Sequence, residues 1–380
     1  MNYYKESLKM HEKNKGKMEI KSKVSLKNKD DLSIAYTPGV AEPCREIHKN
    51  PENVYKYTIK GNSVAVVTNG TAVLGLGNIG AKAALPVMEG KCLLFKKFAN
   101  IDAYPICLDT LDNEEIIRTV KLISPGFGGI NLEDIKAPDC FEIEERLIKE
   151  LDIPVFHDDQ HGTAIVSLAA LINACKITKR KISEAKIILN GAGAAGIAIA
   201  KLLLAYGFKN MILIDSVGAI YKGREGLNSE KEKMAQITNL ERLKGGLSEA
   251  IEGSDVFIGI SVAGALKKEW AAKMAPQSII FAMANPTPEI MPDEAKKAGA
   301  FIIATGRSDF KNQINNVLAF PGIFRGLLDA RVKKVTEKMK LAAAQSLADL
   351  VKNPNPNKII PAVFDKRVVK KIAAEIKKYV

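Results

Sequence analysis

The chain contains few cysteines, and their arrangement argues against a disulfide framework. Its 380 residues include only Cys44, Cys92, Cys107, Cys140 and Cys175. The number is odd, and no two of them show the Cys-x-x-Cys spacing typical of thiol metal sites and redox centres. We therefore expect free thiols in a reducing compartment, and a cytoplasmic protein.

Long apolar runs are missing as well. The first residues, Met1 to Lys23, are rich in lysine and lack the apolar segment of a secretory signal. Residues 1 to about 30 are instead predicted to be a polar lead-in to a first helix. The longest helical apolar stretch, Thr163 to Cys175, is shorter than the roughly 20 residues that cross a bilayer. We therefore expect no membrane association.

Basic residues are in excess, but they do not gather into a stripe. The formal net charge is +13, yet the lysines are spread along the whole chain and rarely alternate with aromatic residues. Nucleic-acid-binding surfaces concentrate both kinds of side chain. We therefore expect a solvated lysine-rich surface with no nucleic-acid partner, whose positive field attracts small anions.

The order of predicted elements indicates two α/β regions. From Ser63 to Phe156, short strand-like runs alternate with helical patterns, and a similar alternation begins again near His161. A chain of this length is expected to form about two domains of about 150 residues each. We predict an N-terminal α/β substrate domain over residues 1–160. A Rossmann-like, doubly wound parallel-sheet domain with C-terminal helices is predicted over residues 161–380.

The dinucleotide fingerprint Gly-x-Gly-x-x-Gly occurs twice, at residues 75–80 and 191–196. Only the second copy lies between a strand pattern and a helical pattern with an acid, Asp215, closing the next strand. Asp215 follows Gly191 by 24 positions, near the roughly 20 expected for the acid that binds the adenosine ribose. The predicted NAD or NADP turn comprises Gly191, Ala192, Gly193, Ala194, Ala195 and Gly196. The first copy lacks such an acid and is expected to have another role.

Two acidic clusters directly follow predicted strands. Glu133 and Asp134 form the first cluster, and Asp158 and Asp159 form the second. Carboxylates that converge at the ligand-binding edge of a sheet repel one another unless a cation neutralises them. Hard oxygen ligands with open positions suit Mg²⁺ or Mn²⁺. Either cluster alone is also explained as the cap and first-turn acids of a helix, and the presence of both favours a metal site.

Two histidines, His157 and His161, flank the second acidic cluster. A zinc site is an alternative here, but no cysteine lies near them in sequence and the spacing fits no common zinc motif. We therefore predict that they support or cap the neighbouring acids.

Four further residues have both a structural and a chemical interpretation. Lys91 is predicted to follow a helix as a surface lysine, whereas a desolvated lysine beside a metal would have a lowered pKa and act as a base. Tyr36 precedes a Thr-Pro-Gly turn and is equally explained as a half-buried tyrosine. Asn285 lies in a turn with two prolines, and Asn316 opens the C-terminal helices, so turn formation and helix capping account for both.

Together, these segments resemble the malic enzyme family, particularly its short prokaryotic members. The matching segments follow one another over about residues 25–365 and are 35–43, 73–80, 131–135, 156–164, 285–287 and 315–322. The resemblance implies metal-dependent oxidative decarboxylation of L-malate to pyruvate and CO₂ with reduction of NADP⁺ or NAD⁺, and decarboxylation of oxaloacetate as a second activity to test. It also implies a homodimer, the commonest oligomer of soluble proteins.

The resemblance assigns a role to each candidate residue. The matching metal ligands are Glu133, Asp134 and Asp159, with Asp158 as the supporting acid beside them. Lys91 matches the general base that takes the C2 hydroxyl proton, and Tyr36 matches the general acid that protonates C3 after CO₂ is lost. The amides of Asn285 and Asn316 match malate contacts, with Asn285 also near the nicotinamide, and Ala192 to Ala195 match the pyrophosphate turn.

The chain departs from larger family members at one position. An arginine that grips a malate carboxylate in those proteins precedes the first glycine fingerprint, where this chain has Ala72 and Val73. We expect the backbone of that glycine turn, or another basic residue, to take its place.

Cofactor choice and two other functions stay open at this point. Asp215 favours NAD, whereas the nearby Lys222 or Arg224 could meet the 2′-phosphate of NADP. A metal-free dehydrogenase of the amino-acid or folate type would share the Rossmann half and give no role to the acidic clusters. A non-catalytic NAD-binding regulator would bind the cofactor without turnover.

Overall fold

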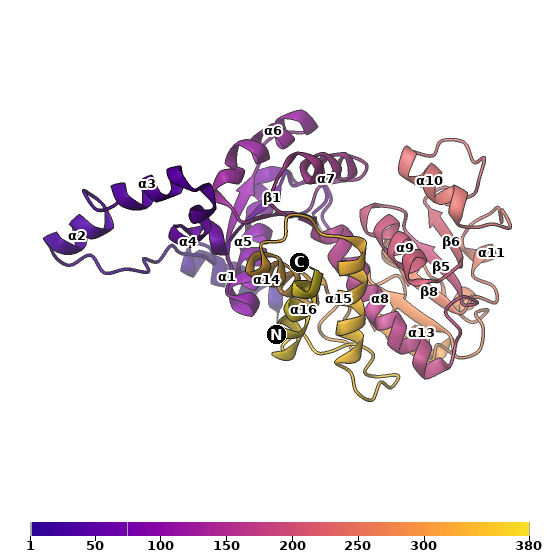
Figure 1. The fold of residues 1–380 in the computed structure, drawn as a ribbon. Helices are drawn as coiled ribbons and strands as arrows, with labels where there is room; N and C mark the ends of the chain where they lie inside the picture. The colour runs from indigo at the N-terminus through magenta and orange to yellow at the C-terminus, as the bar shows by residue number, and fades with distance from the viewer. Residues whose placement is uncertain (1, 74, 380) are drawn as a thin grey trace.

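Short apolar strands alternate with helices to build two mainly parallel sheets (Figure 1). The computed structural model of the protein describes residues 2–73 and 75–379. The first sheet has the order β2-β1-β3-β4. Its strands are β1 (Ser63–Thr68), β2 (Asp102–Cys107), β3 (Gly129–Leu132) and β4 (Val155–His157).

Helices cover both faces of the first sheet because successive side chains of a strand point to opposite faces. On β1, Val64 and Val66 pack with α5 (Gly80–Ala99). The alternate residues Ala65 and Val67 pack on the other face, where α6 (Asn113–Ile123) and α7 (Asp139–Glu150) lie. The predicted N-terminal α/β unit is thus present as a three-layer arrangement.

The second sheet has the order β10-β9-β8-β5-β6-β7, with β7 alone antiparallel. Its strands are β5 (Lys186–Asn190), β6 (Asn210–Asp215), β7 (Gly218–Ala219), β8 (Val256–Gly259), β9 (Ile279–Ala282) and β10 (Ile302–Thr305). Strand order reverses between β5 and β8, which is where ligands bind in doubly wound sheets. The predicted Rossmann-like fold is confirmed, and the two-residue β7 is an addition that the sequence pattern did not indicate.

The two faces of the second sheet are covered by different sets of helices. On one face lie α9 (Ala194–Tyr206) and α10 (Ser229–Ile237). The other face packs against α11 (Leu247–Ala250), α12 (Lys268–Ala271) and α13 (Pro292–Lys297).

Helix α8 (Asp158–Thr178) connects the two sheets and lies in the core. It begins five residues before the apolar stretch from which it was predicted, so Asp158 and Asp159 lie in its first turn. The expectation that this segment is too short to cross a membrane is therefore wrong on length, because the helix has 21 residues. Its apolar window is 78% buried inside the protein, as in the core helix of a globular fold.

The C-terminal helices return to the first sheet. They are α14 (Phe320–Ala330), α15 (Glu337–Asp349) and α16 (Arg367–Ile376). The Phe95 ring of α5 lies 4.7 Å from the Phe320 ring and 5.2 Å from the Phe324 ring, centroid to centroid. Helix α14 therefore packs on α5, which covers the first sheet, whereas α15 packs on α8. The division into domains at residue 160 stays a prediction.

The N-terminal region is helical from its start. Its helices are α1 (Tyr3–Asn14), α2 (Lys29–Ala35), α3 (Ala41–Lys49) and α4 (Val54–Tyr57). The prediction of a polar lead-in is wrong for α1, which the Asn2 side chain caps by accepting from the backbone N–H of Lys5. Short 3-10 turns elsewhere are η1 (Pro51–Asn53), η2 (Ile59–Asn62), η3 (Ser124–Gly126), η4 (Asn316–Leu318) and η5 (Lys377–Tyr379).

Candidate active site

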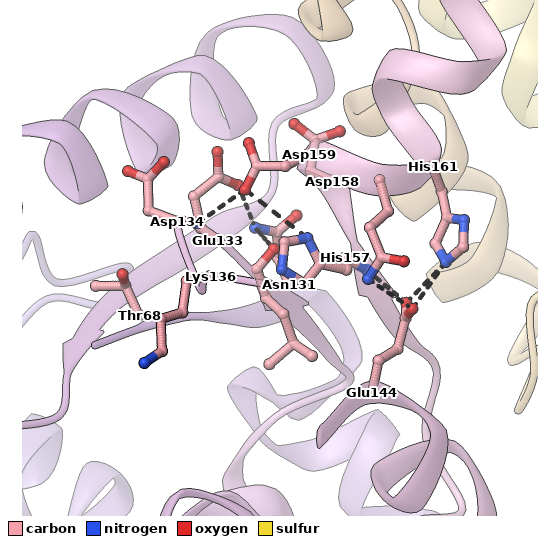
Figure 2. A network of polar contacts seen from close by, with 12 residues as sticks. Thr68, Asn131, Glu133, Asp134, Lys136, Glu144, His157, Asp158, Asp159 and His161 are labelled. Atoms are coloured by element: carbon pink, nitrogen blue, oxygen red, sulfur yellow. Dashed lines mark hydrogen bonds and ion pairs between the residues drawn. The ribbon is translucent and has the colours of Figure 1, made fainter. Parts of the chain in front are cut away.

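Two neighbouring parallel strands bring the acidic clusters together. Because β3 and β4 pair in register through Leu132 and His157, the residues that follow them leave the sheet side by side. One carboxylate oxygen each from Glu133, Asp134 and Asp159 lies within 4.8 Å of the others. Figure 2 shows these three side chains gathered at the strand ends.

The carboxylate cluster has the chemistry of a divalent-cation site. The Asp134 backbone is left-handed, with φ of +53°, and its N–H donates to Asp159 Oδ2 at 2.8 Å. Its own Oδ2 atom is buried and has no hydrogen-bond partner in the described part of the chain. A buried, unpaired carboxylate oxygen is costly unless a cation binds it. Three carboxylates with no histidine or cysteine among them fit Mg²⁺ or Mn²⁺.

Lys91 lies inside α5 and points into this cluster. Its Nζ is 2.7 Å from Glu133 Oε1 and 2.6 Å from Asp158 Oδ2, and its side chain is 7% exposed. The surface interpretation and the predicted helix end before Lys91 are both wrong, because the buried face of α5 continues past Gly90 with Cys92 and Phe95.

Without a metal, the pKa of Lys91 is raised, and the lowered pKa expected beside a metal stays a prediction. Burial lowers this pKa, but the negative charges of Asp158, Glu133 and Asp159 outweigh burial and leave it above the ordinary value. Lys91 is therefore protonated at neutral pH unless another cation neutralises the surrounding carboxylates.

Burial raises the pKa values of the four carboxyl groups around Lys91. Burial, reinforced by Asp159 and Glu133, raises the pKa of Asp134 to about 9. Burial also raises the pKa of Glu133 and of Asp158 to about 7 and that of Asp159 to about 6, against the opposing charge of Lys91. Such clustering of raised carboxyl pKa values is typical of functional sites.

In the absence of a divalent cation, we expect the protein to lose stability as the pH rises from about 5 to about 8. Between its unfolded-state pKa and its raised folded-state pKa, a carboxyl group binds more protons in the folded state than in the unfolded state. The free energy of unfolding therefore falls as the pH rises through this interval. The raised pKa of Lys91 adds stability that stays constant below the ordinary lysine value. Thermal unfolding in EDTA should show a Tm that decreases with pH, by roughly 2 °C for each kcal/mol of lost stability. Added Mn²⁺ should oppose this decrease. A Tm that rises with pH in EDTA would contradict the charge assignment.

A buried glutamate that the sequence did not single out fixes the second acidic cluster. Glu144 of α7 accepts the backbone N–H of His157 at 2.8 Å and the Gln160 amide at 3.2 Å, and His161 Nε2 lies 2.9 Å from its Oε2 (Figure 2). Burial raises its pKa, but His161 and the other donors lower it more. Glu144 thereby anchors the junction of β4 and α8, on which Asp158 and Asp159 lie. A lone glutamate in an amphipathic helix gave no sequence signal for this role.

The two histidines take supporting positions. His157 is fully buried, and burial lowers its pKa to about 4, which keeps it neutral. Its Nδ1 is 3.7 Å from Asp159 Oδ2. His161 contacts Glu144, as described above. Neither histidine belongs to the carboxylate cluster.

One cavity of about 1490 Å³ brings most of the predicted site residues together. Its lining includes Lys91, Glu133, Asp134, Asp159, Gly193, Ala194, Ala195, Gly196, Asn285 and Asn316. Gly75, from the first glycine fingerprint, also lines it. A Cβ atom at Gly75 would lie 2.8 Å from the backbone oxygen of Asn285, so this turn approaches the Asn285 segment closely. The first fingerprint therefore forms part of the cavity wall and leads directly into α5, the helix that carries Lys91.

The second fingerprint has the geometry of a dinucleotide turn. Gly191 has φ of +120°, and a Cβ atom at Gly196 would lie 1.9 Å from the Gly191 oxygen, so only glycine permits this contact of strand and helix. A Cβ atom at Gly193 would meet open space, where the first N–H groups of α9 can receive a pyrophosphate. Gly191 and Ala192 support this turn without lining the cavity.

Asp215 ends β6 as predicted, but its carboxylate is already engaged. Oδ2 pairs with Arg224 at 2.5 Å and with Lys231 at 2.7 Å. Oδ1 accepts the backbone N–H groups of Val217 and Gly218. Burial raises the pKa of Asp215, and these donors lower it well below its usual range.

Four predicted site residues do not line the cavity, namely Gly191, Ala192, Asp215 and Tyr36. The exposed one among them is Tyr36. It directly follows α2, its side chain is 67% exposed, and it is not part of the cavity lining. The half-buried alternative is therefore wrong.

Comparisons with known proteins agree with this architecture. The family model for the malic enzyme N-terminal domain matches residues 15–117, and that for the malic enzyme NAD binding domain matches residues 160–380. The bifunctional malic/malolactic enzyme of Bacillus subtilis is 58% identical, over 100% of this chain and 93% of its own length. The NAD-dependent malic enzyme of Geobacillus stearothermophilus is 58% identical, over 94% of this chain and 75% of its own.

A solved structure shows the same arrangement of elements. The NAD-dependent malic enzyme of Thermotoga maritima superposes with a TM-score of 0.95 at 51% identity, covering 98% of each chain. With both family models matched and this level of identity over the whole length, the chain belongs to the malic enzyme family.

Proposed function

We propose that the protein catalyses the divalent-metal-dependent oxidative decarboxylation of L-malate to pyruvate and CO₂, with reduction of NADP⁺ or NAD⁺. The observation that carries this proposal is Lys91, buried between Glu133 and Asp158 in the same cavity as the dinucleotide turn. A proton-exchanging group, a carboxylate cluster and a dinucleotide turn are the parts that a metal-assisted alcohol oxidation needs. Membership of the malic enzyme family supports the same reaction.

The carboxylate cluster and Lys91 have separate roles in metal binding and proton transfer. Glu133, Asp134 and Asp159 would hold the divalent cation. When bound, Mg²⁺ or Mn²⁺ polarises the substrate oxygens, and the nicotinamide accepts the hydride. Lys91 then experiences less uncompensated negative charge, so its pKa falls and it takes the proton of the C2 hydroxyl. Asp158 keeps Lys91 Nζ oriented by their 2.6 Å ion pair.

Amide groups and a glycine turn bind the substrate. Asn285 and Asn316 both line the cavity and offer N–H donors to malate carboxylates. The turn at Gly75 lies against the Asn285 segment and also lines the cavity. We propose that this turn takes the place of the arginine that larger relatives carry.

Tyr36 completes the reaction as the general acid. Loss of CO₂ leaves the enolate of pyruvate, which must gain a proton at C3. The Tyr36 O–H bond breaks as the C3–H bond forms, and solvent reprotonates the phenolate.

The surroundings of Asp215 favour NADP⁺ over NAD⁺. Both carboxylate oxygens are occupied, which leaves no free acceptor for the ribose 2′-hydroxyl. Arg224 and Lys231 instead add positive charge beside the end of β6, where a 2′-phosphate is received in this fold.

Replacing Arg224 by alanine should therefore lower kcat/KM for NADP⁺ about tenfold or more, since a charge-assisted phosphate contact contributes on the order of 1.5 kcal/mol or more. The value for NAD⁺ should change little or rise as Asp215 is released. Steady-state kinetics with both cofactors test this. Lys209→Ala, which removes an exposed lysine just before β6, at the end of the strand opposite Asp215, is the matched control. Equal losses with both cofactors would refute the assignment.

Product analysis tests the proposed reaction itself. With L-malate, Mn²⁺ and NADP⁺ or NAD⁺, we expect reduced cofactor and pyruvate to form in equal amounts, with CO₂ release. Oxaloacetate added in place of malate should also be decarboxylated. Accumulation of oxaloacetate from malate without pyruvate would overturn the decarboxylating assignment.

We further propose a cytoplasmic homodimer without a nucleic-acid or membrane partner. The spread of lysines over the chain and the free thiols support the location and the absence of these partners. The dimer is supported by exposed apolar side chains of the N-terminal region, such as Ile20 and Ile34.

A further inference from the structure

We infer that His11 of α1 binds the C4 carboxylate of L-malate inside the active-site cavity. The inference rests on the proposed function, because it takes L-malate as the substrate. The cation and Lys91 account for the C1 carboxylate and the C2 hydroxyl. The Gly75 turn offers the C4 carboxylate only neutral backbone N–H groups, and a positively charged donor binds a carboxylate more strongly than a neutral one.

Helix α1 forms one wall of the cavity. Its lining residues are Ser7, Met10, His11 and Asn14, which occupy the i, i+3, i+4 and i+7 positions of a single helical face. The matched family model for the N-terminal domain begins at residue 15, after α1 ends. That comparison therefore assigns α1 no role, although the helix contributes a continuous face to the site.

The end of α1 is attached to α5, so this wall lies on the substrate side of the cavity (Figure 1). The Lys17 backbone N–H donates to Glu89 Oε2 at 3.0 Å, and Lys17 Nζ donates to the Pro86 oxygen at 2.5 Å. Gly16 has φ of +106°, and a Cβ atom there would lie 2.8 Å from Glu89 Oε1. Helix α5 carries Lys91 and follows the first glycine fingerprint, whereas the dinucleotide turn belongs to the second sheet.

The His11 ring is held at one nitrogen and offers the other to a ligand. Nδ1 lies 2.7 Å from the Ser7 carbonyl oxygen, and a carbonyl oxygen only accepts, so Nδ1 carries a hydrogen. Nε2 is buried and has no hydrogen-bond partner among the residues that the structure describes. A buried polar atom of this kind costs free energy unless a ligand or water pairs with it. In the imidazolium form Nε2 also carries a hydrogen and donates to a carboxylate.

His11 supplies the positive charge that the glycine turn lacks. Ala72 and Val73 stand where larger relatives carry an arginine, and the ammonium group of Lys17 is occupied by the Pro86 oxygen. The C4 carboxylate loses its charge as CO₂ leaves, so a cation beside it stabilises bound malate more than the transition state of C–C cleavage. The expected contribution of His11 is therefore to malate affinity.

Calorimetric titration of the protein loaded with Mn²⁺ and NADPH tests the inference without turnover. We expect His11→Leu to raise the Kd of L-malate about tenfold or more, as befits the loss of a charge-assisted hydrogen bond. Oxalate also chelates Mn²⁺ but has no further carboxylate, so its Kd should not change. Equal weakening of malate and oxalate, or an unchanged malate Kd, would overturn the inference.

Two further variants separate the contact from a structural effect on α1. His11→Gln offers an N–H donor without the charge, so its loss of malate affinity should be smaller than that of His11→Leu. Lys13→Leu is the matched control, because Lys13 is an exposed basic residue of the same helix that does not line the cavity. A loss in Lys13→Leu as large as that in His11→Leu would show a nonspecific effect of α1 and overturn the inference.

The inference and the proposed function fail in distinguishable ways. A wild-type protein that forms no pyruvate from L-malate would refute the proposed function, and the inference with it. Wild-type turnover of malate, together with wild-type malate affinity in His11→Leu, would overturn the inference alone.

Discussion

Lys91→Ala is expected to reduce malate oxidation by about a thousandfold, within the range attributed to general acid–base groups, while leaving the affinity for NADP⁺ nearly unchanged. Lys91 Nζ contacts Glu133, Asp158 and the Phe320 ring, none of which belongs to the dinucleotide turn. The later proton steps of oxaloacetate decarboxylation should decline as well. Steady-state rates and a fluorescence titration with NADPH measure the two effects separately.

Lys91→Arg separates the charge of Lys91 from its proton transfer. Arginine retains the positive charge that the buried carboxylates need, but it does not release its proton at accessible pH. We expect this variant to keep a Tm closer to that of the wild type than Lys91→Ala does, and to remain inactive. A fully active Lys91→Arg enzyme, or equal losses of cofactor affinity and turnover in Lys91→Ala, would count against Lys91 as the base.

Asp134→Asn is expected to have opposite effects on activity and on stability. Asparagine is the side chain that best tolerates the left-handed backbone at this position, where φ is +53°. The substitution removes one of three mutually repelling carboxylates, so the metal-free protein should gain on the order of 1 kcal/mol of stability. This sign follows because a carboxyl pKa raised to about 9 opposes folding at neutral pH. Turnover with Mn²⁺ should nevertheless fall at least a hundredfold as the cation loses a ligand.

Three measurements make this prediction specific. Mn²⁺ binding, followed by the electron paramagnetic resonance signal of the free ion, should weaken in parallel with turnover. Thermal unfolding in EDTA should show a higher Tm and a smaller decline with pH than the wild type. Asp139→Asn changes a nearby α7 acid whose ion pair is with Lys136 at 3.4 Å, and it should alter none of these quantities. Unchanged Mn²⁺ affinity in Asp134→Asn would remove Asp134 from the cation site.

The convergence of the two acidic clusters was predictable because it follows from chain topology. Parallel strands place their carboxyl ends at one edge of a sheet, so Glu133–Asp134 and Asp158–Asp159 had to meet once β3 and β4 were neighbours. The second glycine fingerprint was predictable for the same kind of reason, since its strand, turn and helix are consecutive in sequence. Local patterns of this kind carry most of their structural meaning within about thirty residues.

Features that depend on contacts between residues far apart in the chain could not be predicted from the sequence pattern. Gly90 resembled a helix end, although the buried face of α5 continues through it to Phe95. Glu144 had no distinguishing sequence signal, and its contact with the His157 backbone depends on the packing of α7 against β4. Asp215 gave the expected spacing, but nothing in the spacing revealed that Arg224 and Lys231 occupy its oxygens.

The position of Tyr36 shows a further limit of sequence reasoning. A family pattern assigns a residue to a site, but it does not say which copy of the chain supplies the residue. The structure adds that Tyr36 is exposed and lies outside the cavity lining of its own chain.

The central claim is that the cluster around Glu133 holds a cation required for malate oxidation, and one assay addresses it most directly. Reduced cofactor formation from L-malate is followed with EDTA-treated protein before and after addition of Mn²⁺. We expect negligible activity without Mn²⁺ and full activity with it. The same rate in both conditions would contradict the claim and favour a metal-free dehydrogenase. Cofactor binding without turnover in either condition would contradict it in favour of a non-catalytic regulator.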